Sequence, residues 1–346
     1  MIRTVLLAAL LASPSGRLFA QEKFPPLKGS TGKVAVSAER FVASLDDRQR
    51  ALATFSLEDP ERQNWHYVPF ERNGLALKAM TEQQKRFVHV LLNGILSQRG
   101  YEKALQVIML EQILAEIENN PERRDAGKYY VLVFGEPGTG QPWGLRFEGH
   151  HLSMNWTFTE DQIESTPSFI GGNPGKVAEG PLKGFRILAS EEDLARKLLL
   201  SLSEQNRDQA IIADKAPRDI LTRELPKAER LADEGLPVSE MTEEQQEMLG
   251  RVAWLYLGRN HWNVARREMA ELSANGWKDV RFAWSGGTNQ GEGHYYRIQS
   301  KDILIEFANT QNGAAHPHAV YRNLSDDFGE DMLRRHVQRD HENIGQ

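Results

Sequence analysis

Two histidines separated by a single proline, His316 and His318, form the pattern in this chain that most directly indicates metal chemistry. Proline between them favours an extended backbone, in which side chains two residues apart point to the same face. Both imidazoles can therefore reach one ion, which is a common arrangement in metal sites. His336 and Asp327 follow in the same C-terminal segment and are candidates to complete the ligand set. Asp327 is also a candidate catalytic carboxylate. The alternative is that these histidines are hydrogen-bonded structural residues and that Asp327 belongs to a helix start.

A second pair of histidines, His150-His151, lies in an aromatic-rich segment that predicts a β-hairpin. We expect a two-residue turn at Gly149-His150, because polar and apolar residues then separate onto opposite faces. In this register His151 joins the polar face and becomes a candidate third metal ligand. The other members of this face are Arg146, Glu148, Ser153 and Asn155. The alternative is that both histidines are solvated turn residues.

The hairpin pattern occurs a second time at a constant offset of 151 residues, so that Arg146 falls on Arg297 and Asn155 falls on Glu306. Arginine binds carboxylate or phosphate in a two-pronged way, so both arginines are candidates to hold an anionic substrate. Asn155 and Tyr295 are further substrate-binding candidates on the same faces, and Glu306 is a candidate general base. The alternative is that each arginine simply pairs with a neighbouring carboxylate.

Each predicted hairpin follows a pair of predicted helices that opens on a similar Met-Thr-Glu motif, with Thr81 or Thr242 as the capping residue. The second hairpin turn is expected at Ser300-Lys301. The sequence therefore predicts an α+β fold of two pseudo-repeats, each a helix pair followed by an antiparallel β-hairpin, packed into one compact body. The expected divisions are a signal peptide at 1–20, an extended leader at 21–37, a first lobe at 38–213, a linker at 214–240 and a second lobe with the histidine-rich segment at 241–346.

The composition limits the chemistry and the partners. The 346 residues include no cysteine, which excludes thiolate catalysis and cysteine-held metals. A transition metal such as zinc, copper or iron would have to be held by imidazole, carboxylate or water. The formal net charge of −6 argues against a nucleic-acid partner and leaves a small-molecule ligand as the expected one.

The N-terminus predicts export. A short positive start is followed by the apolar run from Thr4 to Ala12 and by small residues before Gln21, which is typical of a secretory signal peptide. We expect cleavage near Ala20 and a periplasmic or secreted protein. The apolar run is too short to span a bilayer, so we expect no stable membrane insertion.

Several motifs together resemble one uncharacterised family. They are WHYVPF from Trp65, PWGLRFEGHHLSMNWTF from Pro142, FIGGNPGKV from Phe169, LIEFANTQNGAAHPHAVYRN from Leu304 and DDFGEDMLRRH from Asp326. In combination they resemble the domain of unknown function 3500 family over nearly the whole chain, from about Ala38 to His336. The resemblance implies no activity. It implies that the following residues belong to family motifs: Gly149, His150, His151, His316, His318, Asp327, Gly329 and His336.

The residues together favour an exported, metal-dependent enzyme, a hydrolase or a redox enzyme, that acts on a small anionic molecule. In this hypothesis His151, His316 and His318 bind the metal, with His336 or Asp327 completing the set. The alternative is a non-catalytic periplasmic binding protein for a small acid or a metal ion. A third possibility is a structural module whose histidines only stabilise turns.

Overall fold

The computed structural model describes residues 28–274 and 277–344, so the predicted signal peptide lies outside the described residues. Within this part of the chain there are nine α-helices and a large mixed sheet. The helices are α1 (Lys28–Ala43), α2 (Asp47–Ala53), α3 (Glu82–Ile95), α4 (Gln98–Glu118), α5 (Ala189–Ser201), α6 (Glu204–Ala210), α7 (Glu243–Leu257), α8 (Trp262–Ala274) and α9 (Glu330–Ile344). The short 3-10 helices are η1 (Pro60–Gln63), η2 (Leu77–Ala79), η3 (Val238–Glu240), η4 (Trp277–Asp279) and η5 (Asp327–Gly329).

The strands form one sheet that runs through the whole molecule. They are β1 (Thr54–Phe55), β2 (Leu75–Ala76), β3 (Tyr130–Phe134), β4 (Trp143–Gly149), β5 (Leu152–Phe158), β6 (Ile163–Glu164), β7 (Ser168–Gly171), β8 (Ile211–Ala213), β9 (Leu236–Pro237), β10 (Arg281–Gly286), β11 (His294–Gln299), β12 (Ile303–Gln311) and β13 (His316–Asn323). Their order is β1-β3-β4-β5-β7-β13-β12-β11-β10-β8, with β2, β6 and β9 paired to β3, β5 and β10. The antiparallel pairing of β7 with β13 makes the sheet continuous between its two halves.

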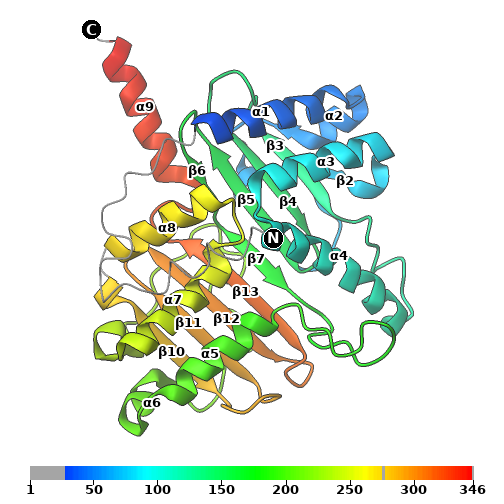
Figure 1. Ribbon diagram of the computed structural model, residues 1–346. Coiled ribbons are helices and arrows are strands. Elements are labelled where there is room, and N and C mark those ends of the chain that lie inside the picture. Colours follow the sequence, from blue (N-terminus) through cyan, green and yellow to red (C-terminus); the bar gives the residue numbers. More distant parts are fainter. Residues whose placement is uncertain (1–27, 275–276, 345–346) are drawn as a thin grey trace, which may run out of the picture.

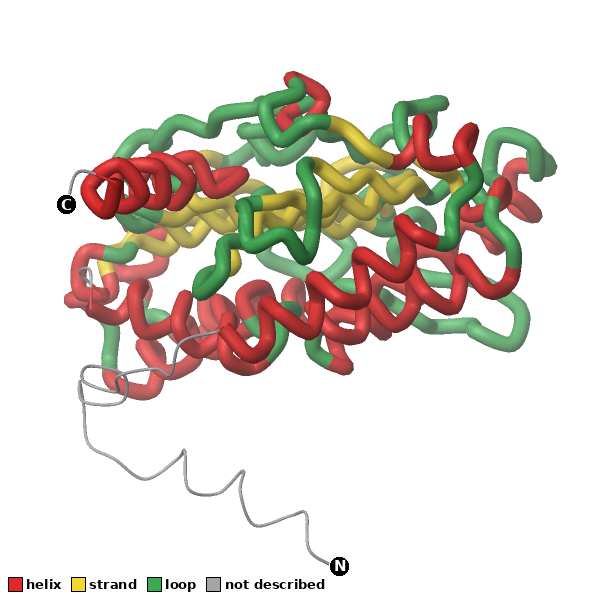
Figure 2. The backbone as a smooth tube through the Cα atoms, turned by 90° about the horizontal axis from the view of Figure 1, so that it is seen from above, coloured by secondary structure: helices red, strands yellow, loops and turns green. Residues whose placement is uncertain are grey.

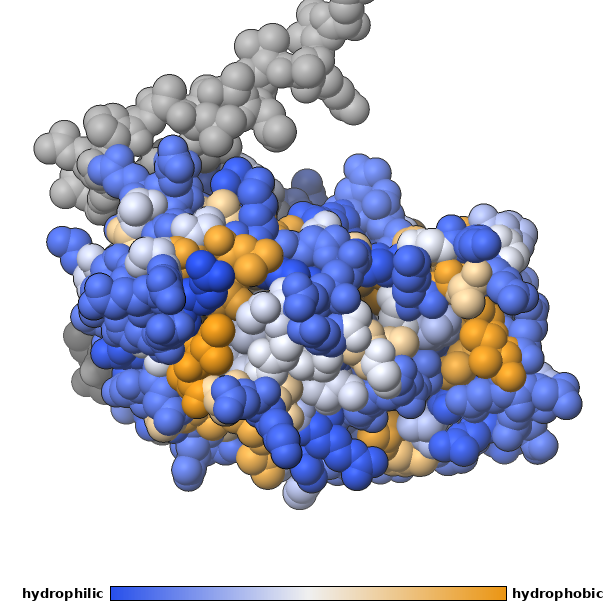
Figure 3. All heavy atoms as spheres, turned by 90° about the horizontal axis from the view of Figure 1, so that it is seen from below, coloured by the Kyte–Doolittle hydropathy of each residue, from blue (hydrophilic) through white to orange (hydrophobic). Residues whose placement is uncertain are grey.

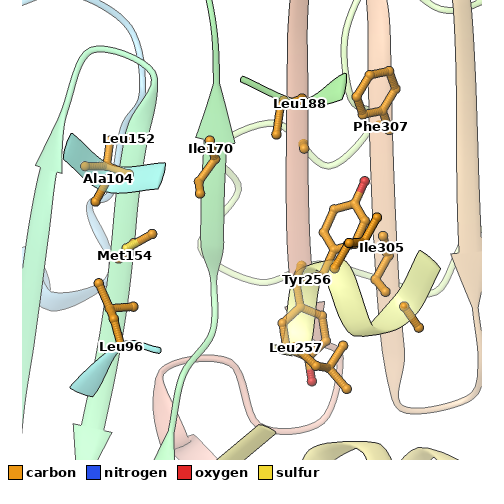
Figure 4. Close-up of a cluster of buried hydrophobic side chains, with 14 of the residues drawn as sticks. Leu96, Ala104, Leu152, Met154, Ile170, Leu188, Tyr256, Leu257, Ile305 and Phe307 are labelled. Atoms are coloured by element: carbon orange, nitrogen blue, oxygen red, sulfur yellow. The ribbon is translucent and has the colours of Figure 1, made fainter. Parts of the chain in front are cut away.

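The sheet separates a layer of helices from a layer of loops (Figure 2). Apolar side chains of β5, β7 and β12 meet apolar residues of α4 and α7 on the helical side (Figure 4). Helix α9 extends away from this body at the C-terminal end (Figure 1). Seen from below, the surface is mainly hydrophilic and its apolar side chains form separate patches (Figure 3). No helix in the described part of the chain has the length and apolar character needed to cross a membrane.

The predicted helix starts are confirmed at both Met-Thr-Glu motifs. Thr81 and Thr242 each accept a hydrogen bond from the backbone of a glutamine three residues later, and that glutamine side chain returns a bond to the cap. Such reciprocal capping satisfies backbone N–H groups that the first helical turn leaves unpaired. Each glutamine also donates to the end of an earlier helix, Gln84 to Ser44 O at 2.9 Å and Gln245 to Ser201 O at 2.8 Å.

The predicted extended leader is wrong from Lys28 onward, because α1 begins there. Val34, Ala38 and Phe41 have helical spacing and are buried, so the packing of this stripe stabilises a helix despite two glycines in its first turns. The predicted linker at 214–240 is also revised. Its residues 214–235 lie on the loop side of the sheet, where Ile220 and Thr222 are buried, and do not link separate bodies.

The polar and apolar faces of both hairpins separate as predicted, but the turns lie one residue later. Gly149 pairs with Leu152, so the first turn is His150-His151. A Cβ atom at Gly149 would lie 2.4 Å from the Tyr129 ring. Glycine is therefore required here by the close packing at the end of β4 and not by the turn. In the second hairpin Gln299 pairs with Leu304, which moves the turn to Lys301-Asp302.

Candidate metal centre

Three of the predicted ligands converge at the ends of strands in the middle of the sheet. His151 comes from the turn between β4 and β5, whereas His316 and His318 lie at the start of β13. The Nε2 atoms of His151 and His316 are 2.6 Å apart, and those of His316 and His318 are 3.1 Å apart. One ligand atom of each residue lies within 4.8 Å of the other two. The structure thus brings together histidines that are 165 residues apart in the sequence.

Backbone contacts fix the position of His151. Its φ of 60° is in the left-handed region, which turns the chain sharply at the hairpin tip. Its N–H donates to Tyr67 O at 2.9 Å, and its carbonyl accepts from Gly171 N at 2.8 Å. These bonds attach the hairpin tip to β7 and to the segment between β1 and β2.

Gly171 lies between two of the converging rings. A Cβ atom at this position would be 2.9 Å from Cδ2 of both His151 and His318. Real Cβ atoms do not approach other heavy atoms this closely, so a side chain here would push the rings apart. Glycine at position 171 therefore allows the two imidazoles to share one site.

A carboxylate orients His318 from behind. Nδ1 of His318 is 2.7 Å from Asp219 Oδ1, so a proton on Nδ1 leaves the Nε2 lone pair facing the other histidines. Tyr67 donates a longer hydrogen bond of 3.4 Å to Asp219 Oδ2, and its ring packs edge-on against His318 with the centroids 5.2 Å apart. Metal-binding histidines commonly have such a partner.

His150 supports the site from the other side. Its ring stacks on His151 with 3.7 Å between the centroids. Its Nδ1 is 2.5 Å from Glu111 Oε2, and Arg124 Nη1 is 3.2 Å from the same nitrogen. Tyr129 donates to the His150 carbonyl at 2.9 Å. Contacts to α4 and to the loop after it thus limit the movement of the stacked pair.

The electrostatic environment favours the neutral form of His151 and His316. Burial lowers the pKa of His151 well below its ordinary value, and the neighbouring His150, His316 and His318 lower it further. Burial and His318 lower the pKa of His316 to about 3. Burial opposes ionisation of Asp219, but the hydrogen bond and charge of His318 outweigh it and hold the pKa of that carboxyl below its usual range. Neutral imidazole is the form that binds metal.

The donor set fits a transition metal ion. Three nitrogens at about 2.0–2.1 Å from a tetrahedral ion would be roughly 3.3 Å from one another. The two Nε2–Nε2 distances of 2.6 and 3.1 Å are close to this value, and the rings would separate slightly to admit an ion. A set of three imidazoles suits zinc, copper or iron and leaves further coordination positions for other ligands.

Two predicted members of the ligand set do not join it. His336 is on α9 and is absent from the group that could hold an ion among the described residues. The carboxylate of Asp327 accepts hydrogen bonds from Arg322 Nε at 2.7 Å and from Asn323 N at 3.1 Å. The Asp327 carboxylate therefore stabilises the turn between β13 and η5 and has a structural role.

The predicted general base is also engaged. The carboxylate of Glu306 accepts hydrogen bonds from the backbone of Leu221 at 2.7 Å and from the backbone and hydroxyl of Thr222 at 3.1 and 2.5 Å. It accepts a fourth bond from Tyr295 Oη at 2.8 Å. The hydroxyl of Tyr295, a predicted substrate-binding residue, is therefore also engaged within the protein. Glu306 therefore anchors the segment that carries Asp219.

The two arginines bind protein groups in place of a substrate. Arg146 is fully buried and donates to Asn155, to Glu61 and to the carbonyls of Glu61, Arg62 and Asn64. Arg297 donates to Ala232 O at 2.6 Å and to Glu234 at 3.2 Å. Each arginine anchors the segment that covers its half of the sheet, and Asn155 also donates to Pro167 O. Arg146 also lies 3.7 Å from the neighbouring Glu148, as the alternative expects, whereas the carboxylate partner of Arg297 is Glu234, 63 residues away.

Sequence reasoning missed Asp219, Glu111 and Gly171. Asp219 lies in a segment rich in charge and proline, and nothing in its local pattern points to a histidine far along the chain. Glu111 belongs to a helix in which acidic residues ordinarily face solvent. The aromatic stretch around Tyr67 is the sequence feature that points to this part of the site, because such a stretch can form part of a binding wall.

The fold and the site define an α+β protein with one large sheet, in which three imidazoles converge at the ends of central strands. The chain belongs to the family described as Protein of unknown function (DUF3500), whose model matches residues 28–330. No curated protein and no solved structure matches it.

Proposed function

We propose that this protein is a metal-dependent enzyme with a three-histidine centre formed by His151, His316 and His318. The observation that carries the proposal is the convergence of their ring nitrogens on one point, from a hairpin turn and a distant strand. The lowered pKa values of His151 and His316, the carboxylate of Asp219 behind His318 and the space left by Gly171 support it. Bound there, an ion would supply Lewis-acid or redox chemistry to a ligand on its remaining positions.

Charge supports a small anionic substrate even without the two arginines. Three neutral imidazoles leave the full positive charge of a divalent ion in place, and the nearby Asp219 offsets only part of it. Arg124 adds positive potential at His151 and His316, but its ion pairs with Glu118 at 2.7 Å and Glu111 at 3.9 Å offset part of it. An anion would therefore be attracted to the remaining coordination positions themselves.

Metal analysis of the purified protein tests the proposal. We expect about one transition metal ion per chain, and loss of that ion together with activity in His316→Ala. The matched control is His89→Ala, which removes an exposed histidine of α3 and should keep the ion. A protein that is isolated without metal and does not bind added zinc or copper would contradict the proposal.

The alternative, a non-catalytic binding protein for a small acid or a metal ion, has one observation in its favour. Both acids that were candidates for catalysis, Glu306 and Asp327, already accept hydrogen bonds from protein groups. A substrate panel applied to the metal-loaded protein separates the two functions. Turnover that His316→Ala abolishes supports the enzyme, whereas tight ligand binding without turnover supports the binding protein.

We also propose that the two halves are pseudo-repeats. In support, the α-helices and strands follow the same order in each half apart from β6 and α9, and the main strand order is symmetric about the β7–β13 pair. Arg146 pairs across its hairpin with Asn155, and Arg297 pairs with Glu306 at the same offset. Superposing residues 80–158 on 241–309 in a crystal structure should place Arg146 on Arg297, and different chain paths would contradict the repeat. His151 then corresponds to Asp302, so the second half has no equivalent of this ligand.

A further inference from the structure

A second group of charged side chains is buried in the helical layer, where the two helix pairs meet. Lys103 of α4 donates to Ile187 O at 2.6 Å, and its Nζ is 3.0 Å from Glu191 of α5. Arg259, the second residue after the end of α7, reaches the same carboxylate at 3.4 Å. Their exposed fractions are 6% for Lys103, 0% for Glu191 and 1% for Arg259. All three are therefore removed from bulk water.

Arg259 has more N–H donors than its neighbours have acceptors for. A guanidinium carries five N–H groups, and the contact with Glu191 employs only Nη2. Nε and Nη1 are buried and have no hydrogen-bond acceptor within residues 28–274 and 277–344. The ring of Tyr256 lies 4.6 Å from the guanidinium carbon and covers one face of the group. A ring face compensates part of the lost hydration, but it does not replace acceptors in the guanidinium plane.

The charges of the group do not balance either. Lys103 and Arg259 contribute two positive charges, and Glu191 contributes one negative charge. Arg99, an exposed residue of the same helix as Lys103, adds a further positive potential at Lys103. Buried charges are normally paired, because transfer of an unpaired ion out of water is strongly unfavourable.

We propose that Arg259 binds a small monovalent anion of halide size in the helical layer between α4, α5 and α7. Such an anion would accept a hydrogen bond from Nε or from Nη1, whose N–H groups point to different edges of the guanidinium, and would cancel the excess positive charge. A water molecule could supply acceptors but would leave the charge unbalanced. The anion must be small, because the side chains of Lys103, Glu191 and Arg259 around it are almost completely buried.

Crystals grown or soaked in sodium bromide give the direct test. We expect an anomalous bromide peak within hydrogen-bond distance of Arg259 Nε or Nη1. Ordered water at this position, in crystals where bromide is visible elsewhere on the protein, would overturn the proposal. This measurement does not involve the histidine site, so its failure and the failure of the proposed metal centre are distinguishable.

Thermal unfolding in solution gives a second test. In sodium chloride the midpoint should be roughly 2–4 °C higher than in sodium gluconate of equal ionic strength, because an anion that binds only the folded state stabilises it. Arg259→Gln should lose this difference. Arg99→Gln changes the net charge equally at an exposed position and should keep it.

Should Arg259→Gln fail to fold, Lys103→Met removes the excess charge by another route and should also lose the chloride effect. An unchanged chloride effect in whichever of these two variants folds, equal to that of the wild-type protein, would overturn the proposal.

Discussion

At the residue scale, the candidate centre depends on a few side chains that prevent one another from moving. His318 is fixed by Asp219, and His151 is fixed by the stacked ring of His150. Gly171 keeps the space between these two ligands open. Ligand geometry is set by such outer contacts as much as by the ligands themselves.

Replacement of Gly171 by alanine should weaken metal binding without removing any ligand. The new methyl group would press on the rings of both His151 and His318, so their nitrogens would no longer converge. We expect a loss of about 10–100-fold in affinity for zinc, the range typical of changes just outside a metal site. Competition with a chelator of known affinity would measure it.

Gly32→Ala is the matched control, because a Cβ at Gly32 would meet nothing within 4 Å. Its affinity should equal that of the wild-type protein. If Gly171→Ala binds zinc as tightly as Gly32→Ala does, the rings are not in contact with the methyl group and the proposed geometry is wrong.

At the element scale, the loop segments 56–74 and 214–235 bind the polar side chains of the sheet that the sequence predicted to bind a substrate. They cover the polar face of the sheet, and they supply Tyr67 and Asp219 to the candidate centre. The anchoring residues on the sheet include Arg146, Arg297 and Glu306. A long irregular segment can be buried in this way only because its backbone groups find partners there.

Arg146→Met should destabilise the fold strongly, because it removes the buried positive charge beside Glu61 and leaves Glu61 Oε1 and the carbonyls of Arg62 and Asn64 without their donor. Loss of one partner of a buried charge pair costs about 3–5 kcal/mol. Arg297→Met should cost less, about 1–2 kcal/mol, since its partners are one carbonyl and the exposed Glu234. Urea unfolding of the two variants measures both values. Equal and small losses of stability, with a raised KM for an anionic substrate, would restore the substrate role.

The sequence was sufficient to predict the capped helices and the hairpin faces, because these depend on local spacing. Thr81 and Thr242 identify helix starts through residues three positions away. The predicted hairpin turns are one residue early, because the polar and apolar strand residues separate equally well when each turn lies one residue later, as the Gly149–Leu152 and Gln299–Leu304 pairs show. The roles of Arg146 and Glu306 could not be predicted, because their partners come from segments 82 to 85 residues away in sequence.

At the scale of the whole molecule, one continuous sheet joins the two halves and places the candidate centre at their boundary. His151 comes from the first half, whereas His316 and His318 come from the second. Formation of the centre therefore requires the β7–β13 pairing, so metal binding and folding of the complete chain should be coupled.

The predicted export concerns the whole chain and can be measured directly. The mature protein should begin near Gln21, after cleavage of the predicted signal peptide near Ala20. Intact mass spectrometry of protein from the periplasm or the medium would determine its first residue. An intact Met1 on protein found only in the cytoplasm would show that the predicted export is wrong.

The stability of the molecule should fall as the pH rises, because two carboxyl groups meet where α8 approaches β6. Burial raises the pKa of Glu268 to about 8 and, together with the charge of Glu268, raises that of Glu164 well above its ordinary value. A carboxyl with a raised folded-state pKa keeps its proton longer in the folded than in the unfolded chain. Its stabilising effect is complete below about pH 4.5, the ordinary value, and is lost as the pH rises toward 8.

Glu268→Gln should therefore flatten the pH dependence of stability. The amide keeps the shape of the protonated acid but cannot ionise, so the variant should be more stable than the wild-type protein at pH 8.5, by on the order of 2 kcal/mol. At pH 5 the difference should be small. Urea unfolding at both pH values measures it, with Glu247→Gln on the exposed side of α7 as the control. If Glu268→Gln loses as much stability between pH 5 and 8.5 as this control, Glu268 is already ionised in the folded protein and does not retain the proton.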